Sequence, residues 1–140
     1  MIRHSRKLLI FLAGALAIVC GAVVSAAPEQ TKTDDRGVFM AIAKAPAKAR
    51  DWKNPYDGQA DALAAGQKLF LQNCSSCHGE NGRGSGRAVN LHLSTVQNAT
   101  PGELEWFLRN GNLWGGMPSW SGLPEQRRWQ IVTYLKSMRR

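Results

Sequence analysis

The stretch NCSSCHGENG, residues 73 to 82, holds the residue types in this chain that are best suited to chemistry. Cys74 and Cys77 are separated by two residues, and His78 follows the second cysteine directly. Such a group can form a disulfide, half of a zinc site, a redox dithiol or an anchor for haem. The partners that the rest of the chain supplies decide between these four readings.

Three of the readings lack the partners they need. A zinc site requires about four ligands, and the only other histidine outside the N-terminal segment is His92, which has no partner pattern around it. A thioredoxin-like dithiol belongs at a strand-to-helix junction, whereas this pair follows an expected helix. A disulfide between Cys74 and Cys77 would close a very short loop and gain little entropy.

The fourth reading, covalent haem, fits the pattern. Two thiols on one helical turn can each add to a vinyl group of the same porphyrin, and C-x-x-C-H in an exported chain is the signature of this attachment. The sequence therefore predicts one haem c, attached through Cys74 and Cys77, with the imidazole of His78 as an iron ligand.

A second iron ligand is expected at Met117. Outside the N-terminal segment the methionines are Met40, Met117 and Met138. Met40 lies in an expected linker and Met138 near the end of a packing helix, but Met117 lies between Gly116 and Pro118 in a loop. Histidine and methionine together form a known haem ligand pair.

The N-terminus reads as an export segment over residues 1–27. Arg3, Arg6 and Lys7 precede an uncharged run that ends in small residues, as in a secretory signal peptide. The run is also just long enough to span a bilayer, so an uncleaved N-terminal anchor is the alternative. Both predict a periplasmic location, either free or at the outer face of the inner membrane.

The remaining chain divides into a predicted flexible tether, 28–58, and a domain, 59–140. The tether is rich in Pro, Lys, Ala and Asp and contains one apolar patch at 38–43, to which the sequence assigns no role. Its composition shows no sustained helical period.

The domain reads as helical throughout. Apolar residues recur at helical spacing after Asp61, which we expect to cap the first helix. Thr100, Pro101 and Glu103 form a capping box for a second helix, which Gly111 ends, and a final helix follows Pro124. Because no run alternates with a period of two, the fold class is all-α. Such a small core also favours a large apolar group held by the cysteines.

Three stretches of the sequence together resemble the class I c-type cytochromes of the bacterial monohaem type. They are GQKLFLQNCSSCHGENGRGSG, GGMPSW and the final helix with IVTYL. The resemblance implies a small helical domain wrapped around the haem, with one haem edge near the surface. It also implies that the first helix crosses the last one where Gly66 and Phe70 meet Tyr134.

The resemblance also implies that the backbone carbonyl of Arg87 accepts a hydrogen bond from the second ring nitrogen of His78. Members of the family often have Pro at this position. Among the tryptophans, we expect Trp106 and Trp129 to lie in the core and Trp120 to line the haem or reach a propionate, since a buried indole needs a partner. The sequence assigns no role to Trp114.

Filled axial positions leave no coordination site for a substrate, so the predicted function is one-electron transfer rather than enzymatic catalysis. The carrier would link an upstream dehydrogenase or complex to a terminal oxidase or another cytochrome. Alternatives are a haem-binding subunit of a larger oxidoreductase complex, or a haem enzyme or gas sensor with a displaceable methionine. The net charge of +8 predicts redox partners with acidic docking surfaces, or contact with the membrane surface, rather than nucleic acid.

Overall fold

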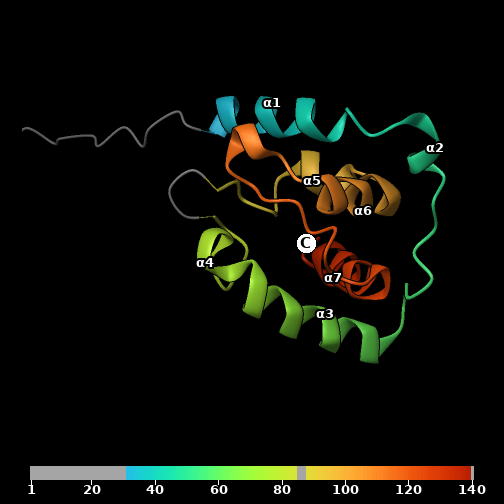
Figure 1. Ribbon diagram of the computed structural model, residues 1–140. Coiled ribbons are helices and arrows are strands. Elements are labelled where there is room, and N and C mark those ends of the chain that lie inside the picture. The colour runs from blue at the N-terminus through green and yellow to red at the C-terminus, as the bar shows by residue number, and fades with distance from the viewer. Residues whose placement is uncertain (1–30, 85–87, 140) are drawn as a thin grey trace, which may run out of the picture.

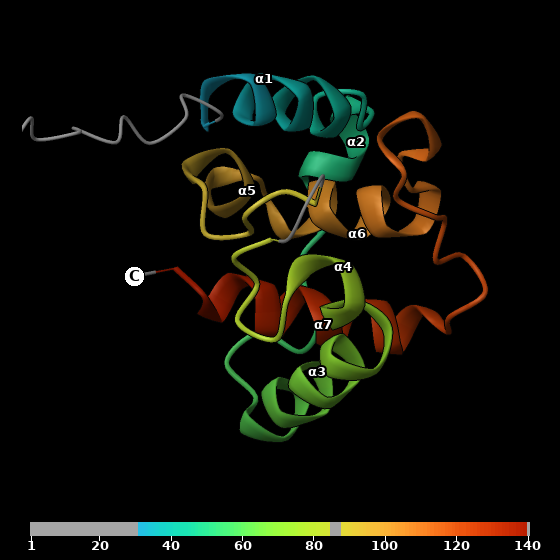
Figure 2. The same cartoon turned by 90° about the vertical axis from the view of Figure 1, so that its left-hand side faces the viewer.

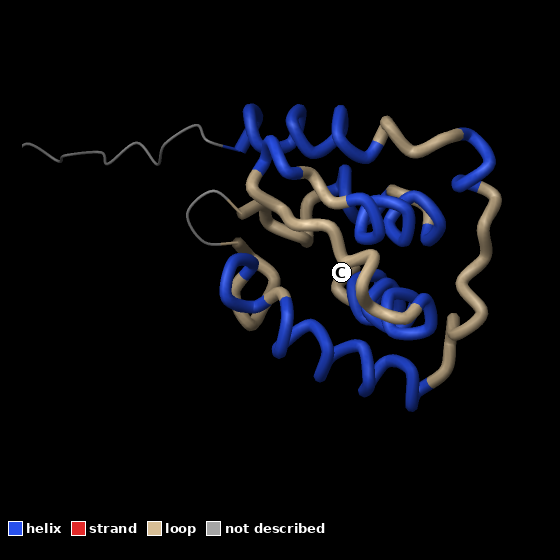
Figure 3. Tube along the Cα trace, in the orientation of Figure 1, coloured by secondary structure: helices blue, strands red, loops and turns tan. Residues whose placement is uncertain are grey.

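The computed structural model describes residues 31–84 and 88–139, which fold into helices connected by loops (Figures 1 and 3). The elements are α1 (Thr31–Ile42), α2 (Ala47–Arg50), α3 (Ala60–Asn73), α4 (Ser75–His78), α5 (Ser94–Asn98), α6 (Pro101–Asn110), the 3-10 turn η1 (Leu113–Gly115) and α7 (Glu125–Ser137). The described residues form no strand, which confirms the all-α prediction.

The crossing of α3 and α7 forms the centre of the fold (Figure 2). Gly66 makes it possible: a Cβ there would lie 2.0 Å from the carbonyl oxygen of Gln130 and 3.1 Å from the Cβ of Tyr134. Phe70, one turn further on, is buried and its ring contacts that of Tyr134. The crossing that the resemblance implied is therefore confirmed.

The hydrophobic core lies between the α3–α7 pair and the α5–α6 layer. Its largest fully buried side chains are Phe70, Ile131 and Val132. Leucines from α6 and the aromatic ring of Trp129 complete it, so the core placement of Trp129 is correct. Trp106 is half-buried on α6.

Helix α6 begins and ends as the sequence predicts. The Thr100 hydroxyl accepts from the Glu103 amide at 3.2 Å, and the Glu103 carboxylate accepts from the Thr100 amide at 2.8 Å. The helix ends at Gly111, whose φ of 71° suits glycine. Local side-chain chemistry thus fixes both ends of this helix.

Helix α3 begins differently from the prediction that Asp61 caps it. The N-cap is Gln59, and no side chain accepts a capping hydrogen bond there. A turn sets the start instead: the Gln59 amide donates to the Tyr56 carbonyl at 3.3 Å, and its side chain donates to the Pro55 carbonyl at 2.9 Å. Asp61 is therefore the second residue of the helix, in its first turn, and it is exposed to solvent.

The prediction of a flexible tether is wrong over residues 31–50. This part of the chain contains α1 and α2, which pack against α5 and α6 (Figures 1 and 2). Ala49 is fully buried because Gly102 of α6 leaves it room; a Cβ on Gly102 would lie 1.9 Å from the Ala49 carbonyl oxygen. Arg50 pairs with Glu103 at 3.0 Å.

The segment after α2 is fixed as well. The Asn54 side chain donates to the Thr133 hydroxyl at 2.9 Å and to the Trp129 carbonyl at 3.3 Å, both on α7. In the apolar patch 38–43, Ala41 and Ile42 are buried whereas Phe39 and Met40 are exposed. One side of the patch thus joins the core.

The expected export segment, 1–27, lies outside the described residues. Among the helices that the structure describes, none has the length and apolar character needed to cross a membrane.

Candidate haem site

The two cysteines and the histidine lie on one tight turn where α3 meets α4. Cys74 ends α3 and precedes α4, and its carbonyl accepts from the amides of Cys77 at 3.2 Å and His78 at 2.9 Å. Cys74 is half-buried and packs against the core, whereas Cys77 is exposed. One thiol thus faces the protein and the other its surface.

Burial controls the ionisation of the inner thiol. It raises the pKa of Cys74 to about 11, and the nearby Cys77 adds to the rise. A redox-active dithiol needs a thiol of lowered pKa. The dithiol reading therefore finds no support in the environment of Cys74.

His78 is held in one tautomer by the loop that follows it. Its Nδ1 lies 3.1 Å from the carbonyl oxygen of Val89 and donates to it, which leaves the Nε2 lone pair for a metal. Burial lowers the pKa of His78, and the hydrogen bond to Val89 opposes that shift. The neutral ring that burial favours is the form that binds a metal.

The acceptor for His78 corrects the expectation from the resemblance. The carbonyl comes from Val89, two positions after Arg87, and Arg87 itself lies outside the described residues. The described residues on either side of 85–87 lie close together. Gly84 has a φ of 83° and its amide donates to the His78 carbonyl at 2.8 Å, while a Cβ on Gly84 would lie 2.3 Å from the Ala88 carbonyl oxygen.

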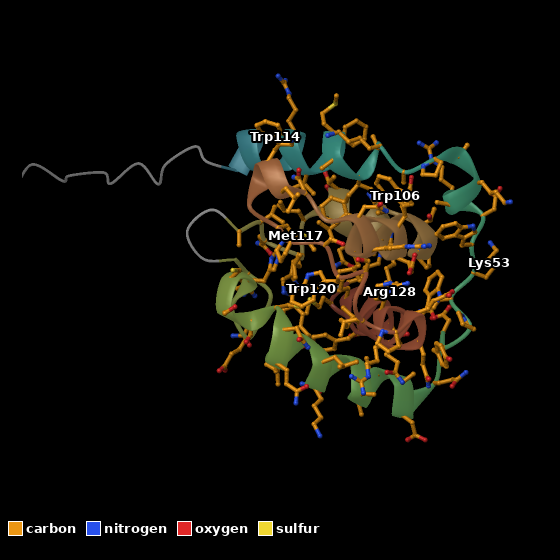
Figure 4. The ribbon with its side chains drawn as sticks, in the orientation of Figure 1. Lys53, Trp106, Trp114, Met117, Trp120 and Arg128 are labelled. Carbon is orange, nitrogen blue, oxygen red and sulfur yellow. The ribbon has the colours of Figure 1, made fainter. Side chains whose placement is uncertain are left out.

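Met117 lies on the segment between α6 and α7, together with Trp120 (Figure 4). Both side chains are half-buried and pack against the core. Met117 pairs with Asn112 through two backbone hydrogen bonds, 2.9 Å and 3.0 Å long. The sequence placed Met117 in a loop, and in the structure its backbone closes the turn that contains η1.

The residues of this region fit haem c. Half-buried side chains that pack against the core lie on α3, on the loop after His78 and on the segment that carries Met117, and these are Leu69, Cys74, Val89, Met117 and Trp120. Two thiols that can bond to a porphyrin, together with an imidazole and a thioether that can bind its iron, are the groups that a haem c requires. A flat apolar group would cover the exposed parts of these side chains.

The zinc reading finds no ligand cluster. In the part of the chain that the structure describes, no three His, Cys, Asp or Glu side chains converge on one point. His92 is engaged elsewhere: its Nδ1 lies 3.1 Å from the Met138 carbonyl oxygen and its Nε2 lies 2.8 Å from that of Asn81. His92 therefore joins the loop after His78 to the end of α7, a role without a sequence signal because Met138 is far along the chain.

The structure also contains a buried ion pair that the sequence did not predict. Glu105 of α6 accepts from Arg128 of α7 at 2.7 Å, with 3% and 7% of the two side chains exposed. Arg128 also donates to the carbonyl of Leu123, in the segment that leads from Met117 to α7. Each charge looks like an ordinary surface residue in the sequence, and only the packing of α6 on α7 brings the two together.

Trp114, which the sequence left without a role, is fully exposed at 101% on η1, next to the exposed Leu113 (Figure 4). It contributes nothing to the core. Trp120 is half-buried, and its contact with haem stays a prediction.

Two comparisons with known proteins agree with this fold. Residues 61–135 match the family model described as cytochrome c oxidase, cbb3-type, subunit III. Among solved structures, cytochrome cL from the marine methylotrophic bacterium Methylophaga aminisulfidivorans MPT is similar, with a TM-score of 0.52 and 24% sequence identity.

That likeness covers 59% of this chain and 57% of the solved chain, and at this identity it shows the fold alone. No curated protein matches the chain significantly. The family model, however, spans more than half of the 140 residues. The chain therefore belongs to the family of cbb3-type cytochrome c oxidase subunit III and carries a monohaem cytochrome c domain.

Proposed function

We propose that this protein carries one electron at a time on a single haem c. Thioether bonds from Cys74 and Cys77 attach the haem, and His78 and Met117 bind its iron. The observation that supports this most is the hydrogen bond from His78 Nδ1 to Val89, 3.1 Å long, because it directs Nε2 toward a metal.

The chemistry follows from the two iron ligands. When bound, the haem supplies a one-electron couple between ferric and ferrous iron. Met117 contributes a soft, neutral sulfur that favours the ferrous state, and the apolar surroundings oppose the additional charge of ferric iron. With both His78 and Met117 as iron ligands, the haem would offer no position to a substrate, and the protein would transfer electrons without catalysing a reaction of its own.

The partners follow from the N-terminal pattern and the charge. The export segment at 1–27 supports a carrier in the periplasm or at the outer face of the inner membrane. There it would receive electrons from a dehydrogenase or an upstream complex and deliver them to a terminal oxidase or another cytochrome. The basic composition supports partners with acidic docking surfaces.

A second candidate function is a haem-bearing subunit of a larger oxidoreductase complex. It is favoured by the description of the family, which names an oxidase subunit. In that case the chain would co-purify with the complex after mild solubilisation of membranes, whereas a diffusing carrier would be recovered alone.

One set of spectra on the purified protein tests the proposal. We expect the haem mass to stay with the denatured polypeptide, the oxidised protein to show a thioether-to-iron charge-transfer absorption, and the ferrous spectrum to be unchanged by carbon monoxide. Haem that acidified organic solvent extracts intact would refute covalent attachment. A sharp carbon monoxide response would support a haem enzyme or gas sensor instead.

A further inference from the structure

The segment that carries Met117 is fastened to the end of α6 at several points. Asn112 and Met117 exchange backbone hydrogen bonds of 2.9 Å and 3.0 Å, which close the turn that contains η1. Further on, the Trp120 amide donates to the Leu108 carbonyl at 2.9 Å. Met117 thus lies between two backbone attachments to the same helix end.

One side chain contributes to this fastening. The Ser119 hydroxyl donates to the Arg109 carbonyl at 2.6 Å, which satisfies a carbonyl that the end of α6 leaves without a helical partner. The same oxygen accepts from the Ser121 amide at 3.3 Å. Ser119 is two residues from Met117, and it is exposed, so the core does not require its side chain.

The chain also passes close to α6 at this place. A Cβ on Gly111 would lie 2.6 Å from the Pro118 carbonyl carbon and from the Ser119 nitrogen. Residues 118 and 119 therefore rest directly on the backbone of Gly111. If the Ser119 hydrogen bond is lost, the attachments that remain near Met117 are the Asn112 pairing and the Trp120 amide.

We propose that Ser119 is a positioning residue that holds Met117 at its iron ligation position through the hydrogen bond to the Arg109 carbonyl. This inference rests on the proposed ligand role of Met117. Release of Met117 from the iron would be easier if its segment could move away from α6. Ser119 opposes that movement, because a hydrogen bond to the helix end must break first.

The test measures how fast cyanide binds the ferric holoprotein, since cyanide must wait for Met117 to leave. At saturating cyanide the wild-type rate should level off at the rate of Met117 release. We expect Ser119→Ala to raise that plateau about fivefold, as expected for the loss of one hydrogen bond. Ser119→Thr, which keeps the hydroxyl, should restore a rate near that of the wild type.

The matched control is Ser121→Ala, which removes a hydroxyl of the same segment whose contact is with Ser119 rather than with α6. It should leave the plateau unchanged. Hydrogen exchange gives a second readout: the Asn112 and Met117 amides should exchange faster in Ser119→Ala than in the wild type, while amides in α3 should be unaffected.

The outcomes separate the two proposals. In one outcome, Ser119→Ala shows the same plateau in the cyanide-binding rate and the same amide exchange as the wild type. That result would overturn the positioning role and leave Met117 as the ligand. If the wild type and Met117→Ala bind cyanide at the same rate without a plateau, Met117 is not the ligand and both proposals fail.

Discussion

The rings of Phe70 and Tyr134 lie 5.3 Å apart between centroids and are tilted by 54° where α3 crosses α7. Tilted aromatic pairs at this separation stabilise a core beyond the area that they bury. The pair can form because Gly66, one turn before Phe70, lets the two backbones approach. The crossing in turn sets the direction in which α3 delivers Cys74 to the candidate haem site.

Replacement of Gly66 tests this close approach. Gly66→Val should destabilise the fold by about 3 kcal/mol, the upper end of the usual overpacking range, because its side chain would overlap the Gln130 carbonyl. Chemical denaturation of the holoprotein measures the change. Ala64→Val, at an exposed position of the same helix, should cost no more than about 0.5 kcal/mol. Equal losses in the two variants would contradict a packing role for Gly66.

Removal of Arg128 should be more damaging than the loss of a surface charge. Arg128→Met leaves the buried Glu105 carboxylate without its partner, and breaking such a pair costs about 3–5 kcal/mol. The double variant Glu105→Gln with Arg128→Met should recover part of the loss, since no buried charge then remains unpaired. Denaturant midpoints provide the comparison. An additive double variant would show that the pair is not coupled.

Covalent attachment of haem should be necessary for the fold. Cys74→Ala with Cys77→Ala should yield a chain that retains no haem on a denaturing gel and is unfolded or rapidly degraded, because the small core loses its largest apolar component. Helical circular dichroism of the recovered protein measures the loss. A fully helical, haem-free variant would show that the polypeptide folds by itself.

Electron transfer to the natural acceptor should slow as the salt concentration rises from about 10 to 200 mM, because added ions screen charge steering. Arg83 is exposed in the loop after His78, and we expect it to contribute. Arg83→Glu should slow association and leave the haem spectrum unchanged, as stopped-flow kinetics would show. Ser76→Glu introduces a negative charge at a second exposed position, on α4 near the cysteines. A rate that is independent of salt would argue against steering.

The basic side chain of Lys136 on α7 takes part in hydrogen bonds within the fold. Lys136 lies within 2.5 Å of the Gln97 carbonyl oxygen and 2.9 Å of that of Ala99, and donates to both. Burial lowers the pKa of Lys136, and the nearby Arg139 lowers it further. This lysine therefore holds α5 to α7, and its replacement would report on stability as well as on docking.

Local signals in the sequence predicted the fold best where one residue acts on its neighbours. The capping box of Thr100 and Glu103 was predicted and confirmed because all its atoms lie within one helical turn. The Asp61 cap was wrong because a competing turn at Tyr56 and Gln59 starts α3 earlier. Composition could not show that α2 would pack closely against Gly102 of α6.

At the candidate site, too, local features could be predicted from the sequence and contacts between distant residues could not. The spacing of Cys74, Cys77 and His78 is local, and the structure places them on one turn. The acceptor for His78 depends on how far the glycine-rich loop folds back, and the resemblance placed it two residues too early. The contacts of His92 and of the Glu105–Arg128 pair join distant parts of the chain, so no short pattern encodes them.

The packing of α1 against the domain shortens the reach of the chain. A flexible tether over residues 28–58 would let the domain move up to about 110 Å from a membrane anchor, at about 3.6 Å per residue. With α1 beginning at Thr31, residues 28–30 allow at most about 11 Å. If residues 1–27 stayed in the membrane, the domain would therefore remain close to the membrane surface, and a redox partner would have to meet it there.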